Sequence, residues 1–289
     1  MSTAAPPRDW SYCSRCVLPD TRPGLSLDRD GVCTACNSHA ARPTIDWDER
    51  ERAFGRVVDE ARRRSAGYDC LIPVSGGKDS TWQVVTCLDH GLRPLCVTWR
   101  PPRRTPIGQR NLDNLVSLGV DHIEFRINPE VEARFARAAF RSHGDPAIPM
   151  HMALFAIPLD LAARYRIPLV VWGENSAVEY GGDDGVSMGH RLDGEWLARY
   201  GVTAGTTWRD WQGCEGLIEG DLLAYRGPSP DELAAAGCEA VFLGHYFAWD
   251  PAHTAAVARR HGFRSDDAGP RTGSNADADI DDELISVHH

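Results

Sequence analysis

The sequence predicts an α/β protein with a Rossmann-like, doubly wound parallel sheet, preceded by a small N-terminal zinc ribbon. From Tyr68 onward, short apolar runs alternate with segments of helical periodicity, which is the pattern of a parallel sheet with crossover helices. The first apolar run ends in Ser75-Gly76-Gly77-Lys78-Asp79-Ser80, a turn of small residues that leads into a helix. Two Cys-x-x-Cys pairs stand ahead of this arrangement.

The zinc ribbon is expected at residues 10–45 because of the spacing of its cysteines. Cys13 and Cys16 form one pair, Cys33 and Cys36 form the other, and sixteen residues separate the pairs. This spacing matches a four-thiolate zinc site, in which each pair forms one knuckle of a closed tetrahedron. A module with so little core needs the metal to fold. A redox dithiol is the alternative, but one such pair leaves the second unexplained.

Residues 46–66 are expected to form an amphipathic helix that links the ribbon to the main domain. Asp46 is a suitable N-cap, and Phe54, Val57 and Val58 follow at helical spacing. The main domain is expected at 67–265, with strands at 68–74, 94–99, 121–127, 168–172 and 240–244. His245 to Phe247 should continue the last strand.

Helices are expected between these strands, at 81–90, 107–118, 130–141 and 150–165, and then at 231–236 and 252–261. Pro158 should kink or divide the helix at 150–165, because proline removes a backbone donor and clashes with the preceding turn. Residues 192–226 are rich in aromatic side chains but show little periodicity. Residues 266–289 are expected to be an acidic, flexible tail.

The hexapeptide 75–80 has the features of a phosphate-binding turn. A helix that begins directly after a strand aims free backbone N–H groups and a positive dipole end at one point. Gly76 and Gly77 let the backbone approach a ligand closely, and Lys78 adds a positive charge. It is not a Walker A loop, because Ile72 stands where the first glycine is required and Asp79 follows Gly-Lys.

Composition limits the classes of function. The net charge of −10 argues against an extended nucleic-acid interface, which relies on Lys and Arg. No apolar stretch approaches the roughly 20 residues that span a bilayer, and the N-terminus has no signal-peptide layout. Nine cysteines without such a signal argue against a disulfide framework. A cytoplasmic, soluble protein without a membrane partner is the expectation.

Ser-Gly-Gly-Lys-Asp-Ser resembles the PP-loop of the N-type ATP pyrophosphatases, the adenine nucleotide alpha hydrolase-like enzymes. More specifically, the chain resembles the N-acetyl sugar amidotransferases. The resemblance covers nearly the whole chain from residue 12, and in that family the protein continues beyond a segment like 281–288, so a C-terminal extension is absent here. The matching segments are Tyr12-Cys13-x-x-Cys16-Val17-Leu18-Pro19-Asp20-Thr21-Arg22-Pro23-Gly24, Asp30-Gly31-Val32-Cys33-x-x-Cys36, Ile45-Asp46-Trp47, Trp172-Gly173-Glu174-Asn175, Glu179-Tyr180-Gly181-Gly182 and Leu243-Gly244-His245-Tyr246-Phe247-x-Trp249-Asp250.

The resemblance implies an ATP-dependent ligase of lipopolysaccharide and surface-glycan biosynthesis. It would adenylate the acetamido oxygen of an N-acetylated, nucleotide-linked sugar and replace it with ammonia, releasing AMP and pyrophosphate. A glutaminase subunit would supply the ammonia, and a homo-oligomer is left open. The cofactors implied are ATP, Mg²⁺ and Zn²⁺.

The resemblance also implies roles for residues at the ends of the strands. Lys78, Asp79 and Glu174 would be catalytic, and Asp79 would hold Mg²⁺. The nucleotide-binding residues would be Ser75, Gly76, Gly77, Lys78, Asp79, Ser80, Thr98, Gly173 and Asn175. Thr98 ends the second strand and would meet the nucleoside, while Glu174 and Asn175 end the fourth and would orient substrate or metal.

Two other functions remain open at this point. A PP-loop sulfur transferase that thiolates tRNA or a small molecule would use the same adenylation, but it would need a reactive cysteine near the ATP site, and only scattered residues such as Cys214 and Cys238 are candidates. An ATP-binding protein without turnover is the other alternative.

A hydrolase nucleophile at Ser187 is disfavoured because no apolar strand precedes it. The pattern Asp277-x-Asp279-x-Asp281 partly matches an EF-hand calcium-binding loop, but Asp282 replaces the required glycine. We expect these residues to belong to a solvated tail.

Overall fold

The computed structural model describes residues 10–21, 25–41, 45–173, 175, 189–266, 269–270 and 276–284. The chain divides into two compact units. One comprises Met1–Asp46 and Asn175–Gly189, and the other Trp47–Glu174 and His190–His289. The cysteine-rich module and the sheet domain therefore fall in different units, and the helix expected to link them belongs to the larger one.

In the smaller unit, antiparallel bridges join Tyr12 to Pro19 and Leu27 to Cys33, and helix α1 (Thr34–Ala41) follows. The core consists of a few residues, namely Cys13, Leu25, Val32 and Cys33. Two of these are predicted zinc ligands, so little apolar surface remains to hold the unit together without the metal.

The larger unit is built on a five-stranded parallel sheet, and the predicted fold class is confirmed. The strands are β1 (Cys70–Pro73), β2 (Pro94–Trp99), β3 (Asp121–Phe125), β4 (Leu169–Trp172) and β5 (Glu239–Phe242), in the order β3-β2-β1-β4-β5. In the centre, Leu71 of β1 lies opposite Leu95 of β2 on one side and Val170 of β4 on the other.

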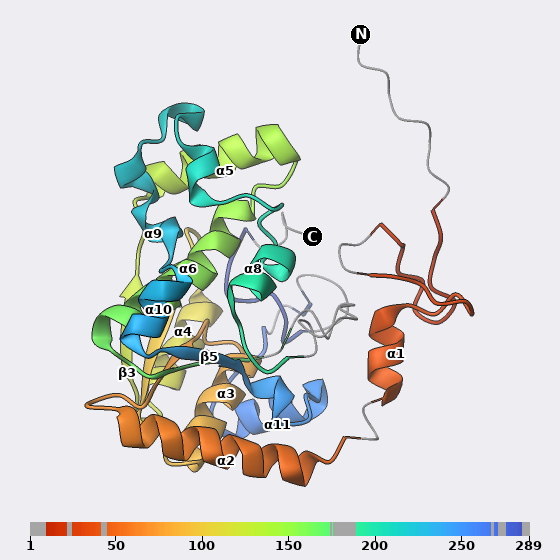
Figure 1. Ribbon diagram of the computed structural model, residues 1–289, viewed down its shortest axis with the longest axis vertical. Helices are drawn as coiled ribbons and strands as arrows, with labels where there is room; N and C mark the ends of the chain where they lie inside the picture. The colour runs from red at the N-terminus through yellow and green to blue at the C-terminus, as the bar shows by residue number, and fades with distance from the viewer. Residues whose placement is uncertain are drawn as a thin grey trace. The chain divides into compact units, whose positions relative to one another are not determined.

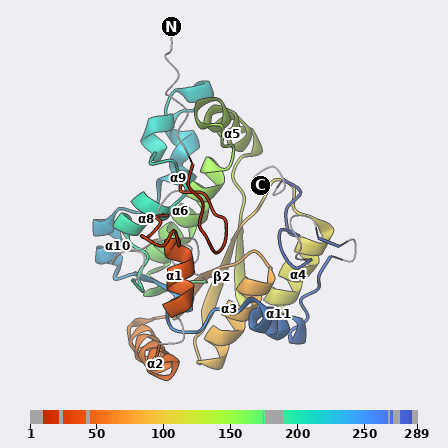
Figure 2. The ribbon, with the colours of Figure 1, turned by 90° about the vertical axis from the view of Figure 1, so that its right-hand side faces the viewer.

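Helices cover both faces of this sheet, which explains why its central strands are continuously apolar. Leu71, Ile72, Val170 and Val171 are fully buried. Helices α3 (Lys78–Asp89), α4 (Pro106–Val116) and α11 (Pro251–Arg260) lie together on one side of the strands, and α6 (Ile148–Tyr165) lies on the other (Figures 1 and 2). Two further long helices are α2 (Trp47–Arg64) and α5 (Pro129–His143).

Four helices start with the same local signal, a capping side chain followed by proline. The cap accepts a hydrogen bond from a backbone N–H of the first turn, and proline at the first helical position needs no donor of its own. The pairs are Thr105-Pro106 at α4, Asn128-Pro129 at α5, Ser229-Pro230 at α10 (Pro230–Ala236) and Asp250-Pro251 at α11. These starts lie within two residues of the predicted ones.

Some predicted elements differ from the structure. Helix α6 continues through Pro158 without division, and the proline is buried against the core. Strand β5 ends at Phe242, and Leu243–His245 is a 3-10 turn, so the strand does not continue to Phe247. The weakly periodic stretch 192–226 consists of short helical pieces, namely α8 (Gly194–Tyr200), the 3-10 turns Trp208–Trp211, Cys214–Gly216 and Glu219–Leu222, and α9 (Leu223–Arg226).

The expectation of a flexible acidic tail is wrong for residues 276–284. This segment runs beside α4 (Figure 2), where Ile280 is 2% exposed and Asp282 is 5% exposed. Thr105 N donates to the carbonyl oxygen of Asp281 at 3.0 Å, and Glu283 N donates to that of Arg103 at 2.9 Å. Within the described residues, no helix is long and apolar enough to cross a membrane.

Candidate functional site

The predicted loop lies at the point where the strand order of the sheet reverses. β1 is followed by α3 on one side, and β4 lies next to β1 on the other side. In open parallel sheets, ligands bind at the carboxyl ends of the strands where the order reverses. Residues 75–80 follow the end of β1, and Gly173 follows the end of β4.

The backbone of the loop requires glycine at one position, and helix α3 begins directly after the next. Gly76 has φ of +91°, and a Cβ there would stand 2.6 Å from the backbone nitrogen of Leu112. Gly77 is the N-cap of α3, and no side chain caps the helix. The first amide groups of a helix have no partner within it, so this end of α3 can accept an anion.

The side chains of the loop are held close together by their own contacts. Lys78 forms an ion pair with the carboxylate of Asp79, and Thr254 of α11 donates to Asp79 Oδ1 at 3.2 Å. Ser75 N donates to Ser80 Oγ at 3.3 Å, and Gly77 N donates to Ser75 Oγ at 3.2 Å. The predicted loop residues are therefore gathered at a single turn.

Thr98 lies beneath this turn and supports it. Its side chain is 3% exposed, and Oγ1 donates to the carbonyl oxygen of Val74 at 2.7 Å. The same hydroxyl lies 2.9 Å from Nε2 of His122, whose pKa is lowered by burial. Through these two contacts Thr98 holds the end of β1 in place, and its contact with the nucleoside stays a prediction.

The turn after β4 is closely packed. A Cβ at Gly173 would stand 3.3 Å from Gln83 Oε1 and 3.4 Å from the ring of Trp249, so glycine permits this approach. Asn175, which belongs to the smaller unit, donates from its Nδ2 to the carbonyl oxygen of Gly189 of the same unit at 3.4 Å. Glu174, predicted to be catalytic, lies outside the described residues, as do Glu179–Gly182 and Ser187.

Asp281 of the C-terminal segment packs against the start of α4 and was not among the predicted site residues. Burial raises the pKa of its carboxyl group. The segment approaches so closely that a Cβ at Gly108 would stand 2.6 Å from Asp281 Cα. No local pattern distinguishes Asp281 from its acidic neighbours, so only the packing against α4 reveals it.

The four cysteines of the smaller unit form the predicted cluster. All four Sγ atoms lie within 4.8 Å of one another, with Cys13 and Cys36 at 3.9 Å and Cys16 and Cys33 at 3.5 Å. Two sulfurs on a tetrahedral zinc would lie about 3.8 Å apart, given zinc–sulfur bonds of about 2.3 Å. The backbone N–H of Cys33 also donates to Cys13 Sγ at 3.2 Å, as suits a thiolate. The donor set therefore fits a structural zinc ion.

The other cysteines offer little to sulfur chemistry at the loop. Cys238 directly precedes β5 and so lies at the amino end of the strands, and burial raises its pKa to about 12. Burial also raises the pKa of Cys70 and Cys96. Cys214 lies in a 3-10 turn that packs on α5. None of these thiols lies in the 75–80 turn or directly after β4.

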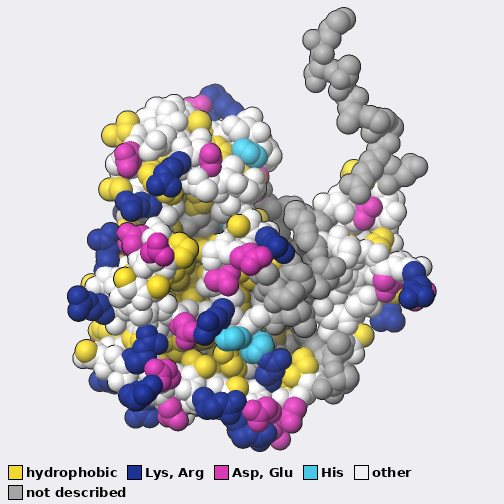
Figure 3. All heavy atoms as spheres, in the orientation of Figure 1, with side chains coloured by type: hydrophobic (Ala, Val, Ile, Leu, Met, Phe, Trp, Pro, Cys, Tyr) yellow, Lys and Arg dark blue, Asp and Glu magenta, His cyan; other side chains and the backbone are white. Residues whose placement is uncertain are grey.

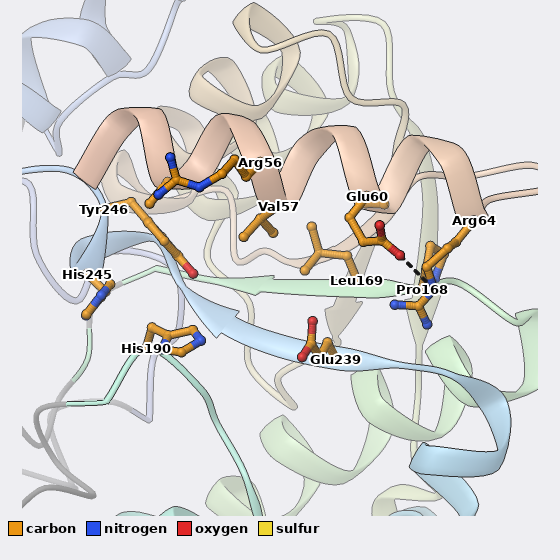
Figure 4. Close-up of a pocket in the computed structure, with 12 residues that line it drawn as sticks. Arg56, Val57, Glu60, Arg64, Pro168, Leu169, His190, Glu239, His245 and Tyr246 are labelled. Atoms are coloured by element: carbon orange, nitrogen blue, oxygen red, sulfur yellow. Dashed lines mark ion pairs between the residues drawn. The ribbon is translucent and has the colours of Figure 1, made fainter. Parts of the chain in front are cut away.

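A separate cavity of about 400 Å³ lies between α2 and the strands β4 and β5. His190, His245 and Tyr246 gather at one end, and Glu60, Arg64 and Pro168 lie at the other (Figure 4). Figure 3 shows histidine side chains beside hydrophobic and charged ones on this face.

The surroundings of His245, at one end of this cavity, favour its neutral form. Burial, with the nearby Arg50 and His190, lowers the pKa of His245 to about 4. Arg50 donates to His245 Nδ1 at 2.9 Å, which leaves that ring neutral with its proton on Nε2. None of the predicted ATP-loop residues lines this cavity.

No protein-family profile and no curated protein matches the chain. Among solved structures, the NAD⁺ synthetase of Burkholderia pseudomallei is similar at 17% identity and a TM-score of 0.33, over 82% of this chain and 95% of that one. The NH₃-dependent NAD synthetase of Campylobacter jejuni is similar at 16% and 0.35, over 75% and 93%. A predicted subunit of tRNA methyltransferase from Methanocaldococcus jannaschii is similar at 14% and 0.35, over 66% and 73%. These similarities are too weak to argue function, and the fold assignment rests on the strand order.

Proposed function

We propose that the protein is an ATP-dependent, AMP-forming amidotransferase that acts on an acetamido group of a nucleotide-linked sugar. The observation that carries the proposal is the Ser-Gly-Gly-Lys-Asp-Ser turn at the switch point of the sheet, with the uncapped end of α3 behind it. The resemblance of the sequence to N-acetyl sugar amidotransferases supplies the acceptor class. This chemistry belongs to the cytoplasm, where ATP and sugar nucleotides are made.

The loop would act on the β- and γ-phosphates of ATP. The amide groups of Gly76 and Gly77 would donate to phosphate oxygens, and Lys78 would turn from Asp79 toward the leaving pyrophosphate. Asp79 is 36% exposed at its side chain, so its hard oxygen atoms fit a Mg²⁺ ion. When bound, that ion would neutralise charge on the phosphates.

The reaction exchanges an oxygen for a nitrogen in two steps. The acetamido oxygen attacks the α-phosphorus, the bond to the bridging oxygen breaks, and pyrophosphate leaves. Ammonia then adds to the activated carbon, the carbon–oxygen bond breaks, and AMP leaves with the original oxygen as an acetamidino group forms. Activation is needed because an amide oxygen is a poor leaving group. A glutaminase partner would supply the ammonia.

The test is release of pyrophosphate and AMP from ATP with UDP-N-acetylglucosamine and other acetamido sugars, in the presence of ammonium and Mg²⁺. Release should rise with the acceptor and fall at least roughly 100-fold in Lys78→Met, as for loss of one transition-state donor. Arg93→Met, which removes a cation at the opposite end of the strands, is the matched control. ATP binding without turnover by any acetamido sugar would contradict the proposal and indicate a binding protein.

A further inference from the structure

Thr254 of α11 is a buried polar residue in contact with a predicted catalytic residue of the loop. It is 0% exposed, and its Oγ1 lies 3.2 Å from Asp79 Oδ1 and 3.2 Å from the carbonyl oxygen of Pro251. A carboxylate and a carbonyl group only accept hydrogen bonds, so both compete for the single hydroxyl proton. The carboxylate is the stronger acceptor because it is charged, and the Pro251 carbonyl lies within α11, where a backbone N–H group is its partner.

The hydroxyl of Thr254 has a contact that a helical threonine does not ordinarily make. Threonine in a helix often donates to a carbonyl group of the preceding turn of its own helix. Thr86 of α3 is of this kind, because its Oγ1 donates to the carbonyl oxygen of Trp82 at 2.9 Å. Thr254 in addition reaches the carboxylate of Asp79 on another helix, 175 positions away in the chain. Removing the Thr254 hydroxyl should therefore be felt at Asp79.

Helix α11 is fixed at both ends, so it can hold this hydroxyl in one place. Its first turn is capped by a side-chain hydrogen bond of 2.8 Å. Beyond its last turn, Asn114 Nδ2 of α4 donates to the carbonyl oxygen of His261 at 2.7 Å. Asn111 of α4 makes two hydrogen bonds to the backbone of Arg264, at 2.9 and 3.0 Å. A group on an element that is held in this way can orient a neighbouring side chain precisely.

The two oxygen atoms of the Asp79 carboxylate have different partners. Oδ1 accepts from Thr254, and Oδ2 is paired with Lys78. In the proposed reaction Lys78 turns toward the leaving pyrophosphate, which frees Oδ2 but leaves Oδ1 held. The Asp79 side chain is 36% exposed whereas Thr254 is buried, so a cation would approach the carboxylate from the side away from the hydroxyl. The arrangement therefore offers one oxygen to a cation and fixes the other.

We propose that Thr254 is a positioning residue for the magnesium site, which fixes Oδ1 of Asp79 so that Oδ2 faces the Mg²⁺ that accompanies ATP. Thr254 itself touches neither the nucleotide nor the metal ion. The inference rests on the proposed use of ATP at the loop, and it does not depend on which acceptor is activated.

The experiment measures ATP binding by isothermal titration calorimetry, once with Mg²⁺ and once with EDTA in its place. Wild type should bind ATP more tightly with Mg²⁺. Thr254→Val keeps the branched shape but lacks the hydroxyl, so it should weaken binding with Mg²⁺ roughly 3- to 10-fold, as for loss of one hydrogen bond. Binding in EDTA should be unchanged, because the glycine backbone and Lys78 are intact. Thr254→Ser restores the hydroxyl and should restore the effect of Mg²⁺.

Thr86→Val is the matched control. It removes a hydroxyl whose printed partner lies within α3 itself, so it should bind ATP as wild type does under both conditions. The thermal midpoint of each variant without ligand shows whether the fold is intact. If Thr254→Val is unstable, Thr254→Ala removes the same hydroxyl with a residue that favours helices.

The outcomes separate positioning from a merely structural role and from the proposed function. Weaker binding with Mg²⁺ alone, restored by Thr254→Ser, supports the inference. Equal binding by wild type and Thr254→Val with Mg²⁺, equal weakening with Mg²⁺ and EDTA, or wild-type binding that ignores Mg²⁺ would each overturn it. Failure of every acetamido sugar to stimulate pyrophosphate release would leave it standing, whereas a folded wild type that binds no ATP would overturn both proposals.

Discussion

Replacing Gly76 by alanine should damage both the fold and ATP binding. At φ of +91°, an L-residue is strained by about 1–2 kcal/mol. The new Cβ would also stand 2.6 Å from Leu112 N and 2.8 Å from Leu112 Cα, which are backbone atoms that cannot rotate away. Forcing extra volume into a packed region costs about 1–3 kcal/mol. The free energy of unfolding should therefore fall by about 2–5 kcal/mol.

Two matched alanine substitutions separate these effects. Gly119 has φ of +97° but nothing within 4 Å of its added Cβ, so Gly119→Ala should cost only the strain, about 1–2 kcal/mol. Gly77 has φ of −65°, and its Cβ would meet only the rotatable Ser75 Oγ at 3.2 Å, so Gly77→Ala should cost at most about 1 kcal/mol. Its methyl group would still keep phosphate away from the loop.

The assay is urea unfolding followed by circular dichroism, together with ATP binding by calorimetry. The expected order of stability loss is Gly76, then Gly119, then Gly77, whereas ATP binding should weaken in the two loop variants and persist in Gly119→Ala. If Gly76→Ala were no less stable than Gly119→Ala, the result would contradict the close packing of α4 against the loop. If Gly77→Ala bound ATP as the wild type does, the loop would not cradle phosphate.

Two further predictions concern the metal and a buried acid. Purified protein should contain zinc, and the double variant Cys13→Ser/Cys36→Ser should lose it while the sheet unit still unfolds cooperatively. Zinc content is measured by atomic emission, and an unchanged content in the double variant would refute the site. The folded protein holds a proton on Glu132 up to about pH 7, against a usual pKa of 4.5, so unfolding free energy should fall as pH rises between these values. Glu132→Gln should remove that part of the slope in urea unfolding at several pH values, and an unchanged slope would show that the carboxyl group is not buried as described.

The loop and the sheet were predictable because their signals are local. Apolar runs and a six-residue motif lie within a few neighbouring positions, and the predicted bounds of the first four strands agree with the observed ones to within about two residues. Pro158 does not divide α6, in which its side chain is buried against the core.

The burial of the C-terminal acidic segment and of Tyr225 was not predictable for the opposite reason. Asp281 and Asp282 lie in an acidic run that has the composition of a solvated tail, and they become buried only because the cap region of α4 presents matching backbone groups. Tyr225 lies in a stretch without periodicity, and its unpaired hydroxyl is a property of its surroundings. Neither position carries a signal that short-range reasoning can detect.

The pairing of Thr105 with Ile280 has a consequence for the order in which the parts of the protein fold. These two residues are 175 positions apart, whereas the Val74–Thr98 contact under the loop spans only 24. Short-range closures form early, and distant ones wait for the rest of the chain. During synthesis, the ATP loop would therefore be folded well before Ile280 leaves the ribosome. The packing of Ile280 against Ile107 of α4 and Phe263 would therefore follow the closure of the loop.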